Sequence, residues 1–120
     1  MKRKVLIIED NLISSTALEM MILSNGFESV GKYDSADELL SLYTSTKPDL
    51  ILLDIMLNGK KTGIEAAKEL RSKSNVPIVF LTALSDSDSI KAIKEIKNSK
   101  ATFKPYAEEL ILQEMKKFFD

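Results

Sequence analysis

The chain has 120 residues, of which 44% are hydrophobic and 29% charged, a size and composition typical of one globular domain. It contains no cysteine and no histidine, which excludes disulfides, thiol nucleophiles, serine–histidine triads and ordinary zinc sites. The 17 basic and 18 acidic residues are interspersed and leave a net charge of −1, so neither nucleic acid nor a membrane is indicated as a direct partner.

The first quarter of the chain predicts a strand, a helix and a second strand. Residues 5–8 form an uninterrupted apolar run, which is typical of a strand buried on both faces of a parallel sheet. Asn11 is suited to cap a helix that runs to about Asn25, with Gly26 in the left-handed position just after its end. A weaker strand is predicted over residues 29–33.

The middle of the chain predicts two helices separated by a third strand. Ser35 and Glu38 have the spacing of a capping box, in which the two side chains bind each other's backbone, at the start of the first of these helices. The apolar positions of this helix are Leu39, Leu40 and Tyr43. Residues 50–53 form a second uninterrupted apolar run and predict another strand buried on both faces. The apolar positions of the next helix, which recur at helical spacing, are Ile64, Ala67 and Leu70.

The last third of the chain predicts a strand, a helix, a further strand and a final helix. The fourth strand is the apolar run 78–81, and a weaker fifth strand covers residues 101–103. Between them, Ser85 and Asp88 have the spacing of a second capping box. The helix that follows this box carries Ile90, Ile93 and Ile96. The final helix has an apolar stripe that we expect to face the core, formed by Leu110, Ile111, Met115, Phe118 and Phe119.

The alternation of strand and helix, repeated about five times, predicts an α/β fold with a parallel sheet and right-handed crossovers. We expect a doubly wound five-stranded parallel sheet with the strand order 2-1-3-4-5, the flavodoxin-like (βα)5 arrangement. No repeat, linker or low-complexity segment interrupts the pattern. Residues 1–120 are therefore expected to form a single domain, with no output domain in this chain.

Polar side chains stand where four of the five predicted strands end. Glu9 and Asp10 follow the first strand, Asp54 the third, Thr82 the fourth and Lys104 the fifth. If the strand order is 2-1-3-4-5, the three carboxylates converge in the crevice beside the carboxyl ends of the strands. Three close carboxylates need a positive partner, and without imidazole or thiolate ligands the natural one is a hard divalent cation such as Mg²⁺. A metal, an ammonium and a hydroxyl around one carboxylate suit phosphoryl transfer to that carboxylate.

Each of these residue types also has an ordinary structural explanation. An acidic pair can cap the next helix, a threonine can simply favour a strand, and a lysine can be a solvated surface residue. An aspartate among leucines is harder to explain, because an unpaired buried charge is costly. A further set of lysines is interpreted as a solvated helix face rather than a nucleic-acid site, namely Lys91, Lys94, Lys97 and Lys100.

The candidate residues are specific as an ordered set rather than one by one. The set consists of Glu9-Asp10, Asp54, Thr82-Ala83 and Lys104-Pro105. With this set in place, essentially the whole chain resembles the receiver domains of two-component response regulators, which are phosphorylation switches. The resemblance implies that Asp54 is the phosphoacceptor and that Thr82 and Lys104 contact the phosphoryl group.

The resemblance also implies a cofactor and a backbone conformation. Mg²⁺ would be bound directly by Asp10, mostly through water by Glu9, and by Asp54 together with the backbone carbonyl of Met56. The peptide bond between Lys104 and Pro105 would be cis, as is usual in this family.

Partners and location follow from the same resemblance. The phosphoryl donor would be a sensor histidine kinase or a phosphotransfer protein, and the chain would catalyse only its own phosphorylation and dephosphorylation. Output would pass through the fourth helix, fifth strand and fifth helix to a target protein, an output domain or a second copy in a phosphorylation-dependent homodimer. No stretch resembles a secretory signal or approaches the roughly 18 apolar residues of a membrane span, so we expect a cytoplasmic location.

Two functions of other classes remain open alongside this one. The chain could be a flavodoxin-like docking module that is never phosphorylated, or a Mg²⁺-dependent phosphatase acting on small molecules. The sequence offers no lid or substrate domain, which argues against the phosphatase.

Two positions depart from the family pattern. The loop after Asp54 has Asn58 where proline is common, and one additional residue before its second glycine. Ala101 stands where the family often has tyrosine or phenylalanine, whose ring turns inward as the hydroxyl residue moves toward the phosphate. Phe103 lies on the same face of the predicted strand, and the hypothesis is that it takes over this role.

Overall fold

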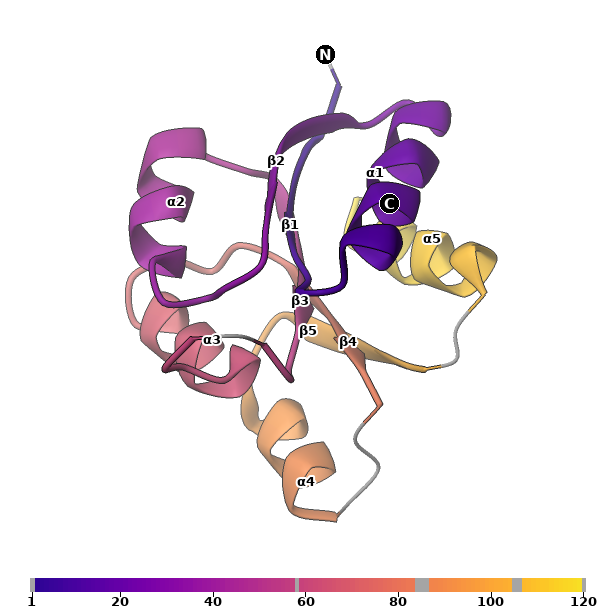
Figure 1. Ribbon diagram of the computed structural model, residues 1–120. Coiled ribbons are helices and arrows are strands. Elements are labelled where there is room, and N and C mark those ends of the chain that lie inside the picture. Colours follow the sequence, from indigo (N-terminus) through magenta and orange to yellow (C-terminus); the bar gives the residue numbers. More distant parts are fainter. Residues whose placement is uncertain (1, 58, 84–86, 105–106, 120) are drawn as a thin grey trace.

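In the computed structural model, which describes residues 2–57, 59–83, 87–104 and 107–119, five parallel strands form one sheet and five helices cover its two faces (Figure 1). The strands are β1 (Lys4–Ile8), β2 (Glu28–Tyr33), β3 (Leu50–Asp54), β4 (Ile78–Thr82) and β5 (Ser99–Phe103). The helices are α1 (Leu12–Ser24), α2 (Leu39–Thr46), α3 (Gly63–Arg71), α4 (Ser87–Glu95) and α5 (Glu108–Lys117). The sheet order β2-β1-β3-β4-β5 confirms the predicted doubly wound, flavodoxin-like fold.

The register of the central strands aligns their carboxyl ends at one edge of the sheet. Ile8 of β1 pairs with Leu53 of β3, and Asp54 pairs with Leu81 of β4. Residues just after these positions therefore emerge side by side. Every residue of β3 and β4 is buried, and the apolar runs 50–53 and 78–81 predict this for strands covered on both faces.

Two hydrophobic cores lie on opposite faces of the sheet. One packs alternate strand residues such as Val5 and Ile7 against α1 and α5, and the other packs Leu6 and Ile8 against α2, α3 and α4 (Figure 1). This division follows from the twofold alternation of side chains along a strand. Within the described ranges, no helix has both the length and the apolar character needed to cross a membrane.

The ends of α1 confirm the sequence signals that predicted them. The Asn11 side chain accepts a hydrogen bond from the Ser14 N–H at 2.9 Å, as an N-cap residue does. The helix ends at Ser24, and Gly26 has a φ of 86°, the left-handed conformation expected just after a helix.

The predicted capping box of Ser35 with Glu38 is wrong. Helix α2 begins at Leu39, after Glu38, whose side chain makes no capping hydrogen bond. The Ser35 hydroxyl instead accepts the N–H of Asp37 at 3.1 Å, in a short turn of the kind that competes with helix formation. For the second predicted box, Ser85 lies outside the described residues, and α4 begins at Ser87.

The predicted core stripe of α5 is wrong at Leu110. Ile111 and Met115 are fully buried, whereas Leu110 is 50% exposed. Adjacent helical residues point about 100° apart, so the turn that buries Ile111 carries Leu110 away from the core. Phe118 and Phe119 are half-buried against the same core as α1, and Phe119 packs against Phe27.

Candidate functional site

Four strand ends meet at one edge of the sheet and bring the expected site residues together. Glu9 and Asp10 directly follow β1, Asp54 and Thr82 end β3 and β4, and Lys104 directly follows β5. The Lys104 N–H donates to the Thr82 carbonyl at 2.7 Å, which ties the end of β5 to that of β4. One carboxylate oxygen from each of the three acids lies within 4.8 Å of the other two.

The Lys104 ammonium bridges the two buried carboxylates of the site. Its Nζ donates to Asp54 Oδ2 at 2.8 Å and to Glu9 Oε1 at 3.1 Å. The second oxygen of each carboxylate accepts a backbone N–H, from Met56 at 3.2 Å for Asp54 and from Asn11 at 3.3 Å for Glu9. Asp54 is 1% exposed and Glu9 is 2% exposed, so these contacts are what keeps two buried charges compatible with the fold.

The surroundings of the site raise the pKa of two of its groups, Lys104 and Asp10. Burial alone would lower the pKa of the Lys104 ammonium, but its hydrogen bonds to Asp54 and Glu9 and their charges raise it to about 12. The pKa of Asp10 is raised above its ordinary value by partial burial and by the hydrogen bond and charge of Glu9. Lys104 is therefore firmly protonated, while Asp10 is repelled by its neighbour.

The donor set of the site suits a hard divalent cation. When Glu9, Asp10 and Asp54 are ionised, three carboxylates face one ammonium and leave two negative charges uncompensated. The ligand atoms are all oxygens, which Mg²⁺ prefers to the imidazole and thiolate that zinc takes. The Asp10 side chain is exposed, so a cation and its water ligands have access to the cluster.

The remaining expected residues differ in how they lie. Thr82 is fully buried at the end of β4. The Met56 backbone lies beside Asp54, and the residue as a whole is 58% exposed. Pro105 and Asn58 lie outside the described residues, so the expected cis peptide bond stays a prediction.

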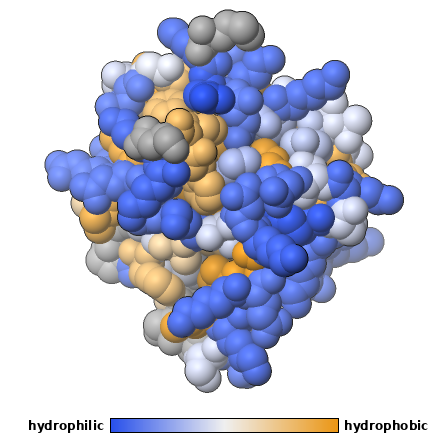
Figure 2. Space-filling model, turned by 180° about the vertical axis from the view of Figure 1, so that it is seen from behind, coloured by the Kyte–Doolittle hydropathy of each residue, from blue (hydrophilic) through white to orange (hydrophobic). Residues whose placement is uncertain are grey.

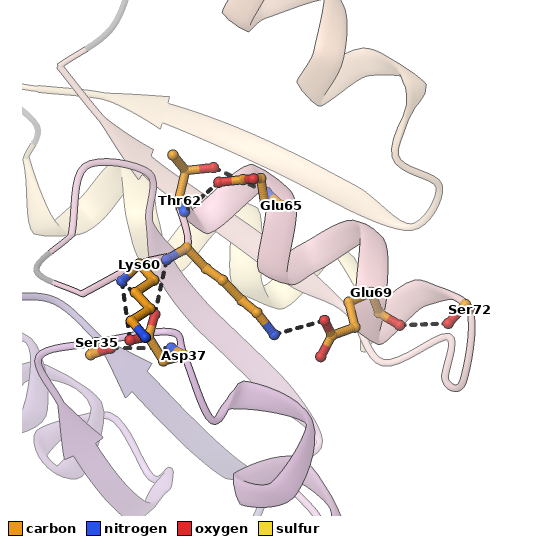
Figure 3. Close-up of polar contacts among 8 residues, drawn as sticks. Ser35, Asp37, Lys60, Thr62, Glu65, Glu69 and Ser72 are labelled. Atoms are coloured by element: carbon orange, nitrogen blue, oxygen red, sulfur yellow. Dashed lines mark hydrogen bonds and ion pairs between the residues drawn. The ribbon is translucent and has the colours of Figure 1, made fainter.

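Two features beside Asp54 were missed in the sequence. Thr62 and Glu65 form a capping box at the start of α3, with hydrogen bonds of 3.1 and 2.9 Å between each side chain and the other residue's backbone (Figure 3). Their Thr-x-x-Glu spacing was a readable signal. Gly63 gave no such signal in the sequence, because its role depends on how closely its backbone approaches the end of β3. A Cβ at this position would meet the backbone oxygen of Asp54 and lie 2.9 Å from the Cα of Ile55.

Comparison with known proteins gives a consistent result across most of the chain. A family model described as the response regulator receiver domain matches residues 5–116. The chain is 34% identical over 105 residues to the transcriptional regulatory protein PdtaR of Mycobacterium tuberculosis, covering 88% of this chain and 51% of that protein. It thus spans about half the length of the PdtaR proteins that it matches.

Solved structures match over nearly the full chain. A DNA-binding response regulator of the LuxR family from Staphylococcus aureus superposes with a TM-score of 0.91, covering 98% of this chain and 99% of that one. At 22% identity, this likeness concerns the fold alone. The signal receiver domain of a modulated diguanylate cyclase from Desulfovibrio desulfuricans is 28% identical, with a TM-score of 0.87 and coverage of 98% and 93%.

Proposed function

Because the chain belongs to the response regulator receiver domain family, we propose that it is a phosphorylation-dependent signalling switch with Asp54 as the phosphoacceptor. The observation that carries this proposal is a carboxylate that is 1% exposed and yet lies 2.8 Å from an ammonium group, at the sheet edge where two further acids converge. A carboxylate that served only the fold would not need a cluster of like charges around it.

The proposed donor is a phosphohistidine on a sensor kinase or a phosphotransfer protein. An oxygen of Asp54 forms the new bond to phosphorus while the bond from phosphorus to the histidine nitrogen breaks, and its electron pair stays on that nitrogen. Mg²⁺ bound by Glu9, Asp10, Asp54 and the Met56 carbonyl would neutralise charge on the transferred group. The Lys104 ammonium, already 2.8 Å from Asp54, is close enough to bind a phosphoryl oxygen, and we assign the Thr82 hydroxyl the same task.

Phosphorylation would shift a two-state equilibrium of the domain. Phosphorylation replaces the single negative charge of the Asp54 carboxylate with a phosphoryl group that carries up to two, and it places several strong acceptor oxygens beside Lys104 and Thr82. Contacts to these oxygens exist only in the phosphorylated form, and such differential contacts are what a population shift requires. Beyond its own phosphorylation and dephosphorylation, we assign the domain no enzymatic activity.

We place the output surface on α4, β5 and α5. Through this surface the receiver would bind a target protein, an output domain or a second copy of itself. On the side of the molecule opposite to the view of Figure 1, hydrophobic patches break the mainly hydrophilic surface (Figure 2). A groove of about 390 Å³ lies between α4 and β5, lined in part by Ile93, Ala101 and Phe103. We expect this signalling to take place in the cytoplasm, with no direct nucleic-acid contact by this domain.

Intact mass spectrometry tests the phosphoacceptor. After incubation with acetyl phosphate and Mg²⁺, the wild type is expected to gain the mass of one phosphoryl group, and Asp54→Asn is expected to gain none. Asp49→Asn is the matched control, because it removes one carboxylate before β3, at the opposite edge of the sheet, and should not change the result. If the wild type stays unmodified, the result would favour a docking module that is never phosphorylated. If the wild type hydrolyses small phosphate esters, the result would favour a phosphatase.

Phe103→Ala tests how the phosphoryl signal reaches the output surface. Phe103 is 45% exposed beside the half-buried Ala101, so its ring has room to move into the groove. We expect the variant to bind beryllofluoride, a phosphoryl mimic, but to show smaller changes in the α4 amide signals by NMR. Amide changes equal to those of the wild type would dismiss this role of Phe103.

A further inference from the structure

The carboxylate of Asp37, in the β2–α2 connection, holds the loop between β3 and α3. Its Oδ1 accepts the backbone N–H of Lys60 and of Lys61, both at 2.9 Å, and its Oδ2 lies 3.1 Å from the Lys60 nitrogen (Figure 3). These contacts join residues 23 and 24 positions apart in the chain. A side chain from one connection thus binds the main chain of another.

Both partners in this contact are held in place. The Asp37 N–H donates to the Ser35 hydroxyl at 3.1 Å, which fixes the turn that carries the carboxylate. On the loop side, Gly59 packs directly on this turn with a φ of 101°, and a Cβ there would lie 2.6 Å from Ser35 Oγ and 2.7 Å from Asp37 Oδ2. Only glycine combines that conformation with that close an approach.

The Asp37 carboxylate is a permanent acceptor at neutral pH. The backbone N–H groups of Lys61 and Lys60 lower its pKa from the ordinary value of 3.8, because they stabilise the ionised form. Ionised, the group accepts hydrogen bonds only, which matches the two N–H donors that it faces. The contact would weaken only in acid, as the pH falls through this lowered pKa.

The loop that Asp37 holds is the one that follows the proposed phosphoacceptor. Its first residues are fixed by the Met56 N–H, which donates to Asp54 Oδ1 at 3.2 Å. Its far end is fixed where the Gly63 N–H donates to the Ile55 carbonyl at 2.9 Å. Between these points in the sequence lie the remaining residues of the connection, and a longer loop loses more conformational entropy when it is ordered. Asp37 binds this connection from outside, at Lys60 and Lys61.

We propose that Asp37 is a positioning residue: by holding the backbone at Lys60 and Lys61, it keeps the loop, and with it the Met56 carbonyl, in the conformation that completes the Mg²⁺ site. This inference rests on the proposed function. A second polar contact between the described part of the loop and its surroundings, the 2.7 Å ion pair of Lys61 with Glu69, involves side chains that are 35% and 45% exposed. Exposed ion pairs of this kind contribute little free energy, so we attribute the restraint of the loop to Asp37.

Three variants of the full chain test the role of Asp37. Asp37→Ala removes the acceptor, Asp37→Asn keeps the one oxygen that binds both N–H groups, and Glu69→Gln removes only the ion pair on the same loop. Isothermal titration calorimetry with MgCl₂ measures the affinity, and amide hydrogen exchange at Lys60 and Lys61 reports the contact itself. Unfolding by urea, measured in parallel, separates a local change from a loss of stability.

We expect Asp37→Ala to weaken Mg²⁺ binding about tenfold, as supporting residues of metal sites do, with faster exchange at both amides and a folded domain. Asp37→Asn should recover most of the affinity, and Glu69→Gln should bind like the wild type. Equal Mg²⁺ affinity in the wild type and in Asp37→Ala, or an equal loss in Glu69→Gln, would overturn the role of Asp37 alone. A wild type that binds no Mg²⁺ would instead overturn the proposed function, and the inference with it.

Discussion

Replacing Lys104 with methionine is expected to lower the free energy of unfolding by about 2–4 kcal/mol in the presence of a chelator. The ammonium donates to Asp54 and Glu9 at 2.8 and 3.1 Å, and both carboxylates are buried. Without it, two neighbouring negative charges remain buried with no cation, which destabilises a fold far more than the loss of a surface ion pair. Urea unfolding followed by circular dichroism measures the difference.

The matched control for this experiment is Lys117→Met. Lys117 pairs with Glu114 at 2.9 Å, but its side chain is 58% exposed, so its loss should change stability by no more than about 1 kcal/mol. Saturating Mg²⁺ should reduce the deficit of Lys104→Met, because a bound cation compensates the same carboxylates. Equal stability of the two variants in chelator would contradict the prediction.

The contribution of Lys104 should not vary with pH over the neutral range. Its pKa of about 12 in the folded protein lies above the 10.5 of a free lysine, so folding favours the protonated form. The stabilisation is therefore complete below pH 10.5 and is lost as the pH rises through 12. Between about pH 6 and 9, the titration of Lys104 itself should therefore add no pH dependence to the stability of the wild type.

Gly63→Ala is expected to lower the free energy of unfolding by about 2–4 kcal/mol, although alanine is the better helix former. Gly63 is the first residue of α3, where helix propensity alone predicts that alanine stabilises. The added Cβ, however, would meet the backbone of Asp54 and Ile55, and backbone atoms at a strand end cannot move aside as a side chain can. Urea unfolding gives the sign directly.

Gly26 provides the control that separates a clash from a strained backbone. It has a φ of 86° but no heavy atom within 4 Å of its added Cβ, so alanine there brings only the backbone strain. Asparagine, which tolerates the left-handed region, should restore stability at Gly26 and should worsen the defect at Gly63. If asparagine gives the same free energy of unfolding relative to alanine at both positions, the close approach of Gly63 to Asp54 does not explain why a side chain at position 63 is destabilising.

Errors in the sequence-based prediction occurred where several local choices were open to the same residues. Ser35 and Glu38 have the spacing of a capping box, yet the Ser35 hydroxyl accepts the N–H of Asp37 in a turn. The conformation of this segment depends on Asp37, which binds the backbone of a different loop. Leu110 belongs to an apolar stretch, yet rotation of the helix leaves it 50% exposed. In both cases the sequence pattern was satisfied by more than one conformation, and packing chose between them.

The amino-acid sequence by itself determined the order of strands and helices, because uninterrupted apolar runs are stable only when helices cover both faces of a parallel sheet. It also determined which polar residues follow the strands, and hence that Glu9, Asp10, Asp54 and Lys104 stand at one edge. Only the tertiary structure decided the contacts that depend on distance between remote segments, such as Gly63 against the Asp54 backbone and Asp37 on the N–H groups of Lys60 and Lys61. Periodicity reports which face of an element is buried, whereas the separation of two loops is set by how the whole sheet and its helices pack.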